Sequence, residues 1–421
     1  MIIFRQKAAV QRMFFSIIVN MVGSLLFSIV FIVYASKAPD AKLAIATAET
    51  ILTLPYLLAF LTGHIADRIK NKVKGMLWVR IFQFAAYLVM SCFINVNESW
   101  LIFGLVLLII FSSSFFAQIS MSLATILLKR FTTKEDLARV RGFESGVTST
   151  MELVAGPLGA ILLAAVHQDF ALFTVINAVS YLFSFFILRG VKEDKDVKVN
   201  DIPAEKEEKD SLRKVTVNFF HEMKGNFALV NSIPQMKHFI LLFILFNLVG
   251  SYQNTLASIT LIHRSDFFIG NYAFTIGVVQ AAFVLGLIVG SIFPMPFLFK
   301  MPLEKNFIIE MFVFALVPVS FLWAPSVYFL IVAILLDGYL QGVSGPKLDA
   351  FLVHLLPDDK IGGGLGAFMS IVGLGVPAGP AVAGIAAMIS DQFAWLAMLL
   401  TIMVGFVYTI YLAKNFRSTV V

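Results

Sequence analysis

The chain has 421 residues, of which 59% are hydrophobic and only 14% are charged, and its net charge is +6. A soluble protein carries nearer a quarter charged residues, so the composition excludes an ordinary soluble domain. Cys92 is the only cysteine, which excludes a disulfide framework, and we expect it to pack inside a helix.

Long apolar stretches follow one another along the whole chain. A helix needs about 20 apolar residues to cross a bilayer, and backbone groups in lipid must bond within their own segment. The sequence therefore predicts an all-α membrane protein with twelve transmembrane helices in two pseudo-symmetric six-helix bundles. The predicted spans are 13–35, 42–63, 75–95, 99–128, 142–166, 169–189, 237–262, 272–298, 306–323, 326–350, 365–388 and 394–413.

A charged segment divides these spans six and six. We expect an N-terminal bundle over 1–190, a cytoplasmic linker over 191–236 and a C-terminal bundle over 237–421. Both signs of charge are dense at the start of the linker, as in a solvated segment. Apolar residues then recur at near-helical spacing over 212–230. They predict an amphipathic helix that lies on the inner membrane surface or packs beneath the bundle.

The basic residues indicate the topology. We assign every Lys and Arg except Lys37, Lys42 and Arg264 to one set of connections. Positive connections stay in the cytoplasm, so both termini and the linker are predicted to be cytoplasmic. The positive charge then reflects topology and not a nucleic-acid partner. The first span is too long for a signal-peptide core, and we expect it to be retained.

The connection after the second span carries a motif. Gly63, Asp67, Arg68 and Lys72 are spaced as in the loop signature of the major facilitator superfamily, which this segment resembles. Gly63 would allow close helix contact, and Asp67 would bind a helix N-terminus or a cation to close an inner gate. The alternative is a solvated positive loop with no gating role.

Small residues and prolines mark the fifth and eleventh spans. The fifth-span segment 156–159 resembles the signature of exporters in the same superfamily, except that Glu152 occupies a usual glycine position. We expect these residues to serve helix packing and a proline kink. They are Gly142, Gly146, Gly156 and Pro157, with Gly379 and Pro380 at similar depth in the eleventh span.

Three acids fall inside predicted spans. Glu152 lies ten residues past Gly142, or about 15 Å deep, which is near the middle of a ~30 Å hydrocarbon core. Asp337 is placed similarly, and Glu49 lies in the outer half of the second span. Ionisable groups at this depth indicate proton coupling or substrate binding, the alternative being a structural hydrogen bond. Glu144, Glu310 and Asp349 are predicted near the inner interface, as gating pairs or solvated groups.

Amides inside the spans supply possible polar contacts to a substrate. These are Asn20, Gln118, Asn247, Gln253 and Gln341. The 43 Phe and 16 Met suit an apolar ligand of variable shape where they face a cavity. The fourth span lacks the arginine of many proton-coupled drug exporters.

Motifs for other functions are absent from the sequence. No phosphate-binding G-x-x-x-x-G-K-[ST] motif occurs, and all the histidines fall in connections or at span ends. We therefore expect no enzyme activity, catalytic residue, cofactor or metal site.

The whole chain resembles major facilitator transporters, and is most similar to macrolide-efflux-type and drug:proton antiporter exporters. The resemblance implies a cavity lined by spans 1, 2, 4, 5, 7, 8, 10 and 11. It also implies proton-coupled export of small amphipathic or hydrophobic, drug- or macrolide-like compounds by rocker-switch alternating access. We expect a monomer in a bacterial inner or plasma membrane, in contact with substrate, protons and lipid. Two alternatives remain: a lipid or lysolipid flippase or carrier on the same fold, and a non-transporting receptor or scaffold.

Overall fold

The computed structural model describes residues 8–96, 99–132, 134–191, 225, 234–355 and 368–415. The predicted surface helix over 212–230 falls outside these residues except for Gly225, so it stays a prediction. The domain boundaries at 190 and 236 stay a prediction as well.

The described residues form helices and contain no strand. The first half consists of α1 (Ala8–Ala35), α2 (Ala41–Leu57), α3 (Ala59–Arg68), α4 (Lys72–Ser91), α5 (Trp100–Phe131), α6 (Lys134–Ala165) and α7 (Phe170–Arg189). The second half consists of α9 (Pro234–Leu261), η2 (Ser265–Phe267), α10 (Tyr272–Ile292), α11 (Pro296–Lys300), α12 (Leu303–Phe314), α13 (Leu316–Leu322), α14 (Val327–Leu355), α16 (Gly375–Ile389) and α17 (Asp391–Asn415).

Eleven helical segments of the described chain are long and apolar enough to cross a membrane. The expected second span is instead two shorter helices, because α2 ends at Leu57, shortly after Pro55, and α3 begins at Ala59. Prolines are common at helix kinks and breaks, and Pro55 lies three residues before this one. When α2 and α3 are counted as one crossing, the described chain has twelve membrane crossings, as predicted.

Prolines also explain three other differences from the predicted spans. The eighth span ends at Ile292 and not at 298, because Pro294 and Pro296 follow. The ninth span is divided at Ala315, next to Phe314, whose carbonyl cannot bond to Pro318 four residues later. The eleventh has a turn at Gly373 and Leu374, where Pro377 removes the corresponding donor.

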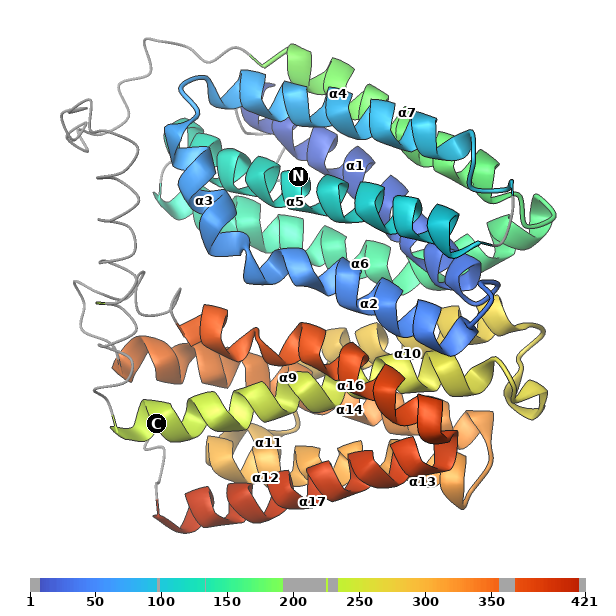
Figure 1. Cartoon of the computed structure of the whole chain (residues 1–421). Coiled ribbons are helices and arrows are strands. Elements are labelled where there is room, and N and C mark those ends of the chain that lie inside the picture. The colour runs from blue at the N-terminus through green and yellow to red at the C-terminus, as the bar shows by residue number, and fades with distance from the viewer. Residues whose placement is uncertain are drawn as a thin grey trace.

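The helices form two bundles, which lie one above the other in Figure 1. In the first bundle α7 packs against α1 and α4, and in the second α10 packs against α14 and α16 against α9. The bundles contact each other mainly through α6 against α10 and α2 against α16. A Cβ atom on Gly156 of α6 would meet the carbonyl oxygen of Gly277 of α10 at 2.8 Å, so glycines allow this close crossing.

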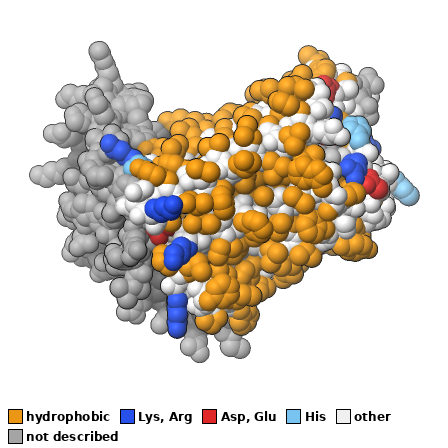
Figure 2. All heavy atoms as spheres, turned by 90° about the horizontal axis from the view of Figure 1, so that it is seen from below, with side chains coloured by type: hydrophobic (Ala, Val, Ile, Leu, Met, Phe, Trp, Pro, Cys, Tyr) orange, Lys and Arg blue, Asp and Glu red, His pale blue; other side chains and the backbone are white. Residues whose placement is uncertain are grey.

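The lateral surface is apolar. Side chains such as Leu101 and Trp78 are more than two thirds exposed, and Figure 2 shows hydrophobic atoms over the broad middle of one face, with charged atoms gathered toward its two ends. This distribution suits a bilayer. Cys92 follows α4 and is exposed, so the expectation that it packs inside a helix is wrong.

Arg80 corrects the topology argument. Its assignment to a connection is wrong, because it lies within α4 and is buried. Its Nη1 donates to Gln83 Oε1 at 2.8 Å, and Gln83 Nε2 donates to the Ser113 carbonyl of α5 at 3.3 Å. Lys347, assigned to a connection as well, lies within α14, and the orientation with both termini cytoplasmic stays a prediction.

Candidate functional site

A cavity of about 650 Å³ lies between the two bundles. Its wall on the first bundle comes from α1 and α6, and its wall on the second bundle from α9, α10, α12, α14 and α16. Three carboxyl groups line it: Glu152, Glu310 and Asp337. None of the described residues that line it is Lys, Arg or His. Aromatic rings, including Phe246, Phe283 and Phe314, supply its apolar surface.

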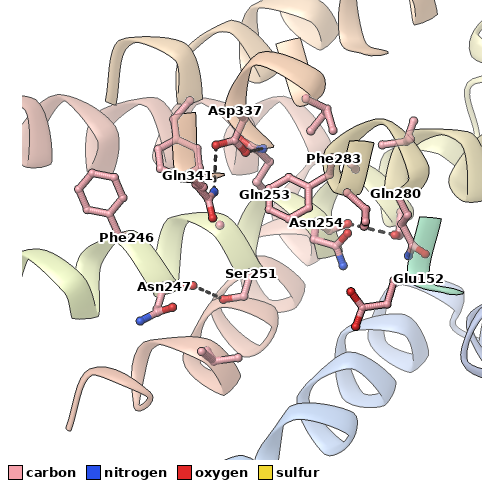
Figure 3. A pocket seen from close by; sticks show the side chains of 18 of the residues that line it. Glu152, Phe246, Asn247, Ser251, Gln253, Asn254, Gln280, Phe283, Asp337 and Gln341 are labelled. Atoms are coloured by element: carbon pink, nitrogen blue, oxygen red, sulfur yellow. Dashed lines mark hydrogen bonds between the residues drawn. The ribbon is translucent and has the colours of Figure 1, made fainter. Parts of the chain in front are cut away.

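Asp337 is held by two amides. Gln341 Nε2, one turn away on α14, donates to Asp337 Oδ1 at 3.0 Å, and Gln253 Nε2 of α9 donates to Oδ2 at 3.4 Å. Figure 3 shows these three side chains together on the wall of the second bundle. From the sequence we expected each of these three residues to bind substrate or a proton. The structure brings them together at one point.

Glu310 of α12 lies beside them, which the sequence did not predict. It is buried and near enough to Asp337 for the two carboxyl groups to repel each other when both are ionised. The expected position near the inner interface is therefore wrong. The difference arises from the start of the helix. Because α12 begins at Leu303 and not at 306, Glu310 lies about one turn further from the helix end than predicted.

Glu152 occupies the opposite wall. It projects from α6 of the first bundle toward the side of the cavity where Asn254 and Gln280 lie (Figure 3). No hydrogen bond joins its carboxyl group to another residue in the part of the chain that the structure describes. It is half-buried, so water in the cavity can reach it.

Glu49 does not line the cavity, although we expected it there. Its Oε1 accepts a hydrogen bond from Asn254 Nδ2 of α9 at 3.3 Å, which joins the two bundles. Lys42, two turns earlier on α2, forms an ion pair with Asp391 of α17 at 2.6 Å and also donates to the Ala387 carbonyl. We call Lys42, Glu49, Asn254 and Asp391 the closing contacts.

The closing contacts all lie toward one end of the molecule. Glu49 is eight residues from the start of α2, and Asn254 seven from the end of α9, so both lie within about 12 Å of that end. The connections 36–40 and 262–271 are at this end, which we call the closed side. The ends Ala8, Pro234 and Asn415 lie at the opposite side (Figure 1).

The predicted gating loop connects α3 to α4. Lys72 is buried, and its Nζ donates to the carbonyl oxygens of Ala66 at 2.8 Å and Asp67 at 2.7 Å, so it caps the end of α3. Asp67 and Arg68 are exposed. A Cβ atom on Gly63 would meet nothing within 4 Å, so the expected close helix contact at this glycine is absent from this structure.

The small residues of α6 and α16 divide into two groups. Gly156 and Gly379 lie in close contacts, and a Cβ atom on Gly379 would meet Ser251 Oγ of α9. Gly146 has open space around it, and the surroundings of Gly142 fall outside the described side chains. Pro157 and Pro380 lie within helices directly after Gly156 and Gly379.

Two of the expected amide contacts lie elsewhere. Asn20 does not line the cavity, because it lies about 140° around α1 from the lining residue Leu25 and faces another direction. Gln118 belongs to α5, which contributes nothing to the lining. Asn247, by contrast, lines the cavity. The implied set of lining spans is therefore wrong in part: among the described side chains the second and fourth spans contribute none, and the ninth, α12, does contribute.

Comparison with known proteins identifies the family. The sequence pattern of the Major Facilitator Superfamily matches residues 13–299, which is more than half of the chain. The chain belongs to the Major Facilitator Superfamily. Membership makes it a secondary transporter that crosses the membrane many times, in agreement with the sequence-based expectation. A search of curated proteins finds no match.

Solved structures of other transporters share the fold. A peptide transporter POT in complex with sulfate has a TM-score of 0.72 at 11% identity, covering 97% of this chain and 95% of that one. A POT family transporter with 5-aminolevulinic acid has a TM-score of 0.70 at 16% identity, covering 96% and 95%. A variant of the nucleoside transporter NupG has a TM-score of 0.69 at 12% identity, covering 96% and 99%. At these identities the likeness concerns the fold alone.

Proposed function

We propose that this transporter exports a small amphipathic compound, neutral or cationic, in exchange for protons. The observation that supports this most is the cavity between the bundles, which combines three carboxyl groups with amides and aromatic rings. Sulfate and 5-aminolevulinic acid, bound in the POT structures, carry anionic groups. In this cavity such anionic groups would lie against carboxylates, and no described lining residue is a Lys, Arg or His that could bind them. We therefore infer a different class of substrate.

Alternating access follows from the closing contacts. On the closed side the bundles are joined by Lys42 with Asp391 and by Glu49 with Asn254. Breaking these contacts while new ones form at the opposite side would expose the same cavity to the other face of the membrane. The contacts are few and partly polar, which suits an interface that must open repeatedly.

Glu152 is our candidate for the proton carrier. It reaches the cavity from the first bundle and has no hydrogen-bond partner among the described residues. A proton can bind it when the cavity faces the acidic side and leave when substrate enters. Each inward proton charge supplies about 2.3 kcal/mol per 100 mV of membrane potential.

The receptor hypothesis fits less well. It predicts a closed centre in which every buried carboxyl group has a partner. The cavity of about 650 Å³ and the unpartnered Glu310 Oε2 favour transport instead.

The test uses the purified protein in liposomes with ethidium, an aromatic cation, as the transported probe. We expect ethidium movement that is stimulated by a pH gradient and accompanied by counter-movement of protons. Glu152→Gln should abolish the pH stimulation, whereas Gly146→Ala, where a Cβ atom meets nothing within 4 Å, should retain it. Equal pH stimulation in Glu152→Gln would remove this residue from the proposal.

A further inference from the structure

The wall around Asp337 contains more hydrogen-bond acceptors than donors. Asp337, Glu310, Gln253 and Ser344 are each at least 97% buried and line the cavity from α14, α12 and α9. Both amide donors in this wall, from Gln253 and Gln341, already point at Asp337.

Three buried oxygens of this wall have no hydrogen-bond partner. They are Gln253 Oε1, Glu310 Oε2 and Ser344 Oγ, of which the last two are close enough to interact but form no well-aligned hydrogen bond. A buried acceptor without a partner is destabilising, so such atoms around a carboxyl pair are unfavourable unless something binds them. Ser344 can donate its O–H to Glu310, but Gln253 Oε1 and ionised carboxyl oxygens only accept, so a cation that contacts all of these groups would satisfy them together.

The chemistry of the atoms restricts the ligand. Carboxylate, amide carbonyl and hydroxyl oxygens are hard donors that prefer alkali and alkaline-earth cations over transition metals. Divalent ions generally require more charged ligands, and no group of three Asp, Glu, His or Cys capable of holding a metal occurs among the described residues. A single positive charge suits two neighbouring carboxyl groups in a low-dielectric wall better than two charges do.

We propose that Asp337, Glu310, Gln253 Oε1 and Ser344 Oγ bind a small monovalent metal cation, of which Na⁺ is the probe. The site goes beyond the proposed proton exchange at Glu152, because it lies wholly in the second bundle and needs neither a substrate nor a transport direction. It would supply a second driving ion.

The position of the site links it to the closing contacts. Gln253 is followed directly by Asn254, which donates to Glu49 across the two bundles. An ion that draws Gln253 Oε1 toward Asp337 and Glu310 therefore fixes the helix segment that carries this contact. Ion binding would in this way favour one of the two orientations of the bundles.

The test is thermal unfolding of the full chain in detergent at fixed pH and ionic strength, in NaCl, KCl or choline chloride. We expect Na⁺ to raise the melting temperature in a saturable manner, and choline to have no effect. Asp337→Asn and Glu310→Gln should raise the half-saturating Na⁺ concentration at least tenfold. Glu152→Gln is the matched control, because it removes a carboxyl group from the opposite wall and should leave the Na⁺ response intact.

A second measurement covers the case in which those variants do not fold. Binding of ²²Na⁺ to the wild-type protein should be displaced by excess NaCl and weakened in Ser344→Ala, which keeps both carboxyl groups. Identical melting in all three salts, or an equal loss of response in Glu152→Gln, would overturn the site. Displacement of ²²Na⁺ by ethidium alone would assign these oxygens to the substrate. All of these outcomes are independent of proton exchange, so the two proposals fail separately.

Discussion

Reversing the charge of Lys42 should open the closed side. Lys42 Nζ lies 2.6 Å from Asp391 Oδ1, and the two side chains are 27% and 25% exposed. A partly exposed ion pair contributes about 0.5–1 kcal/mol, and like charges at the same place cost a similar amount. Lys42→Glu therefore disfavours the closed orientation by about 1–2 kcal/mol, which changes the ratio of the two orientations about 5–30-fold.

The assay is a distance measurement between spin labels at Pro39→Cys and Gln392→Cys, in a Cys92→Ser background. Both positions are exposed on the closed side. We expect Lys42→Glu to increase the population with the longer distance. The double variant Lys42→Glu with Asp391→Lys should return the ratio to within about twofold of the wild type, because the pair is restored with its charges exchanged.

A control and a refutation follow from the same geometry. Lys300→Glu reverses an exposed charge on α11, outside the closing contacts, and should leave the distances unchanged. If Lys42→Glu has the distances of the wild type, or if Asp391→Lys gives no rescue, the ion pair does not hold the closed side.

Three further predictions concern single positions. Gly277→Val should disfavour the closed orientation by about 1–3 kcal/mol, because the new side chain meets backbone of α6 within 3 Å; ethidium transport in liposomes checks this, and a rate equal to that of Gly146→Ala would contradict it. Lys72→Met should lower the free energy of unfolding by about 1.5–3 kcal/mol through loss of the cap on α3, measured by thermal unfolding; an unchanged melting temperature would refute the cap. The Leu172 N–H and the Asn95 amide lower the pKa of Asp169 below its usual range, so its contribution to stability is fully present above pH ~4 and is lost as the pH falls through the lower folded value. Asp169→Ala should therefore melt below the wild type at pH 7 and approach it in acid; a constant difference from pH 7 to pH 3 would contradict the cap on α7.

The apolar pattern was sufficient to predict the helices, because lipid leaves the backbone few other choices. Their interruptions depend on local proline geometry, which the pattern does not contain. The break at Ala315, for example, follows from Pro318, whereas the apolar run around it reads as one uninterrupted span. Positions near span ends were accordingly the least accurate, and Glu310 was placed too near the surface for this reason.

The candidate site was predicted in part. Asp337, Gln253 and Gln341 could be singled out because polar groups are costly at that depth, but their meeting depends on helix rotation. Glu49 has the same signal and bonds across the bundles instead of facing the cavity. Arg80 was misassigned because all but three basic residues were attributed to connections, although it falls within the predicted span 75–95; the i, i+3 spacing of Arg80 and Gln83 is the signal for a buried pair within that helix.

The central claim is that the closed side must open for the cavity to deliver its substrate. The most direct measurement is ethidium transport in liposomes by Lys42→Cys with Asp391→Cys, in the Cys92→Ser background, joined by a short reducible cross-linker. Our account predicts at least a tenfold loss of transport on cross-linking and full recovery after reduction. Transport by the cross-linked protein at the rate of the reduced protein would contradict it.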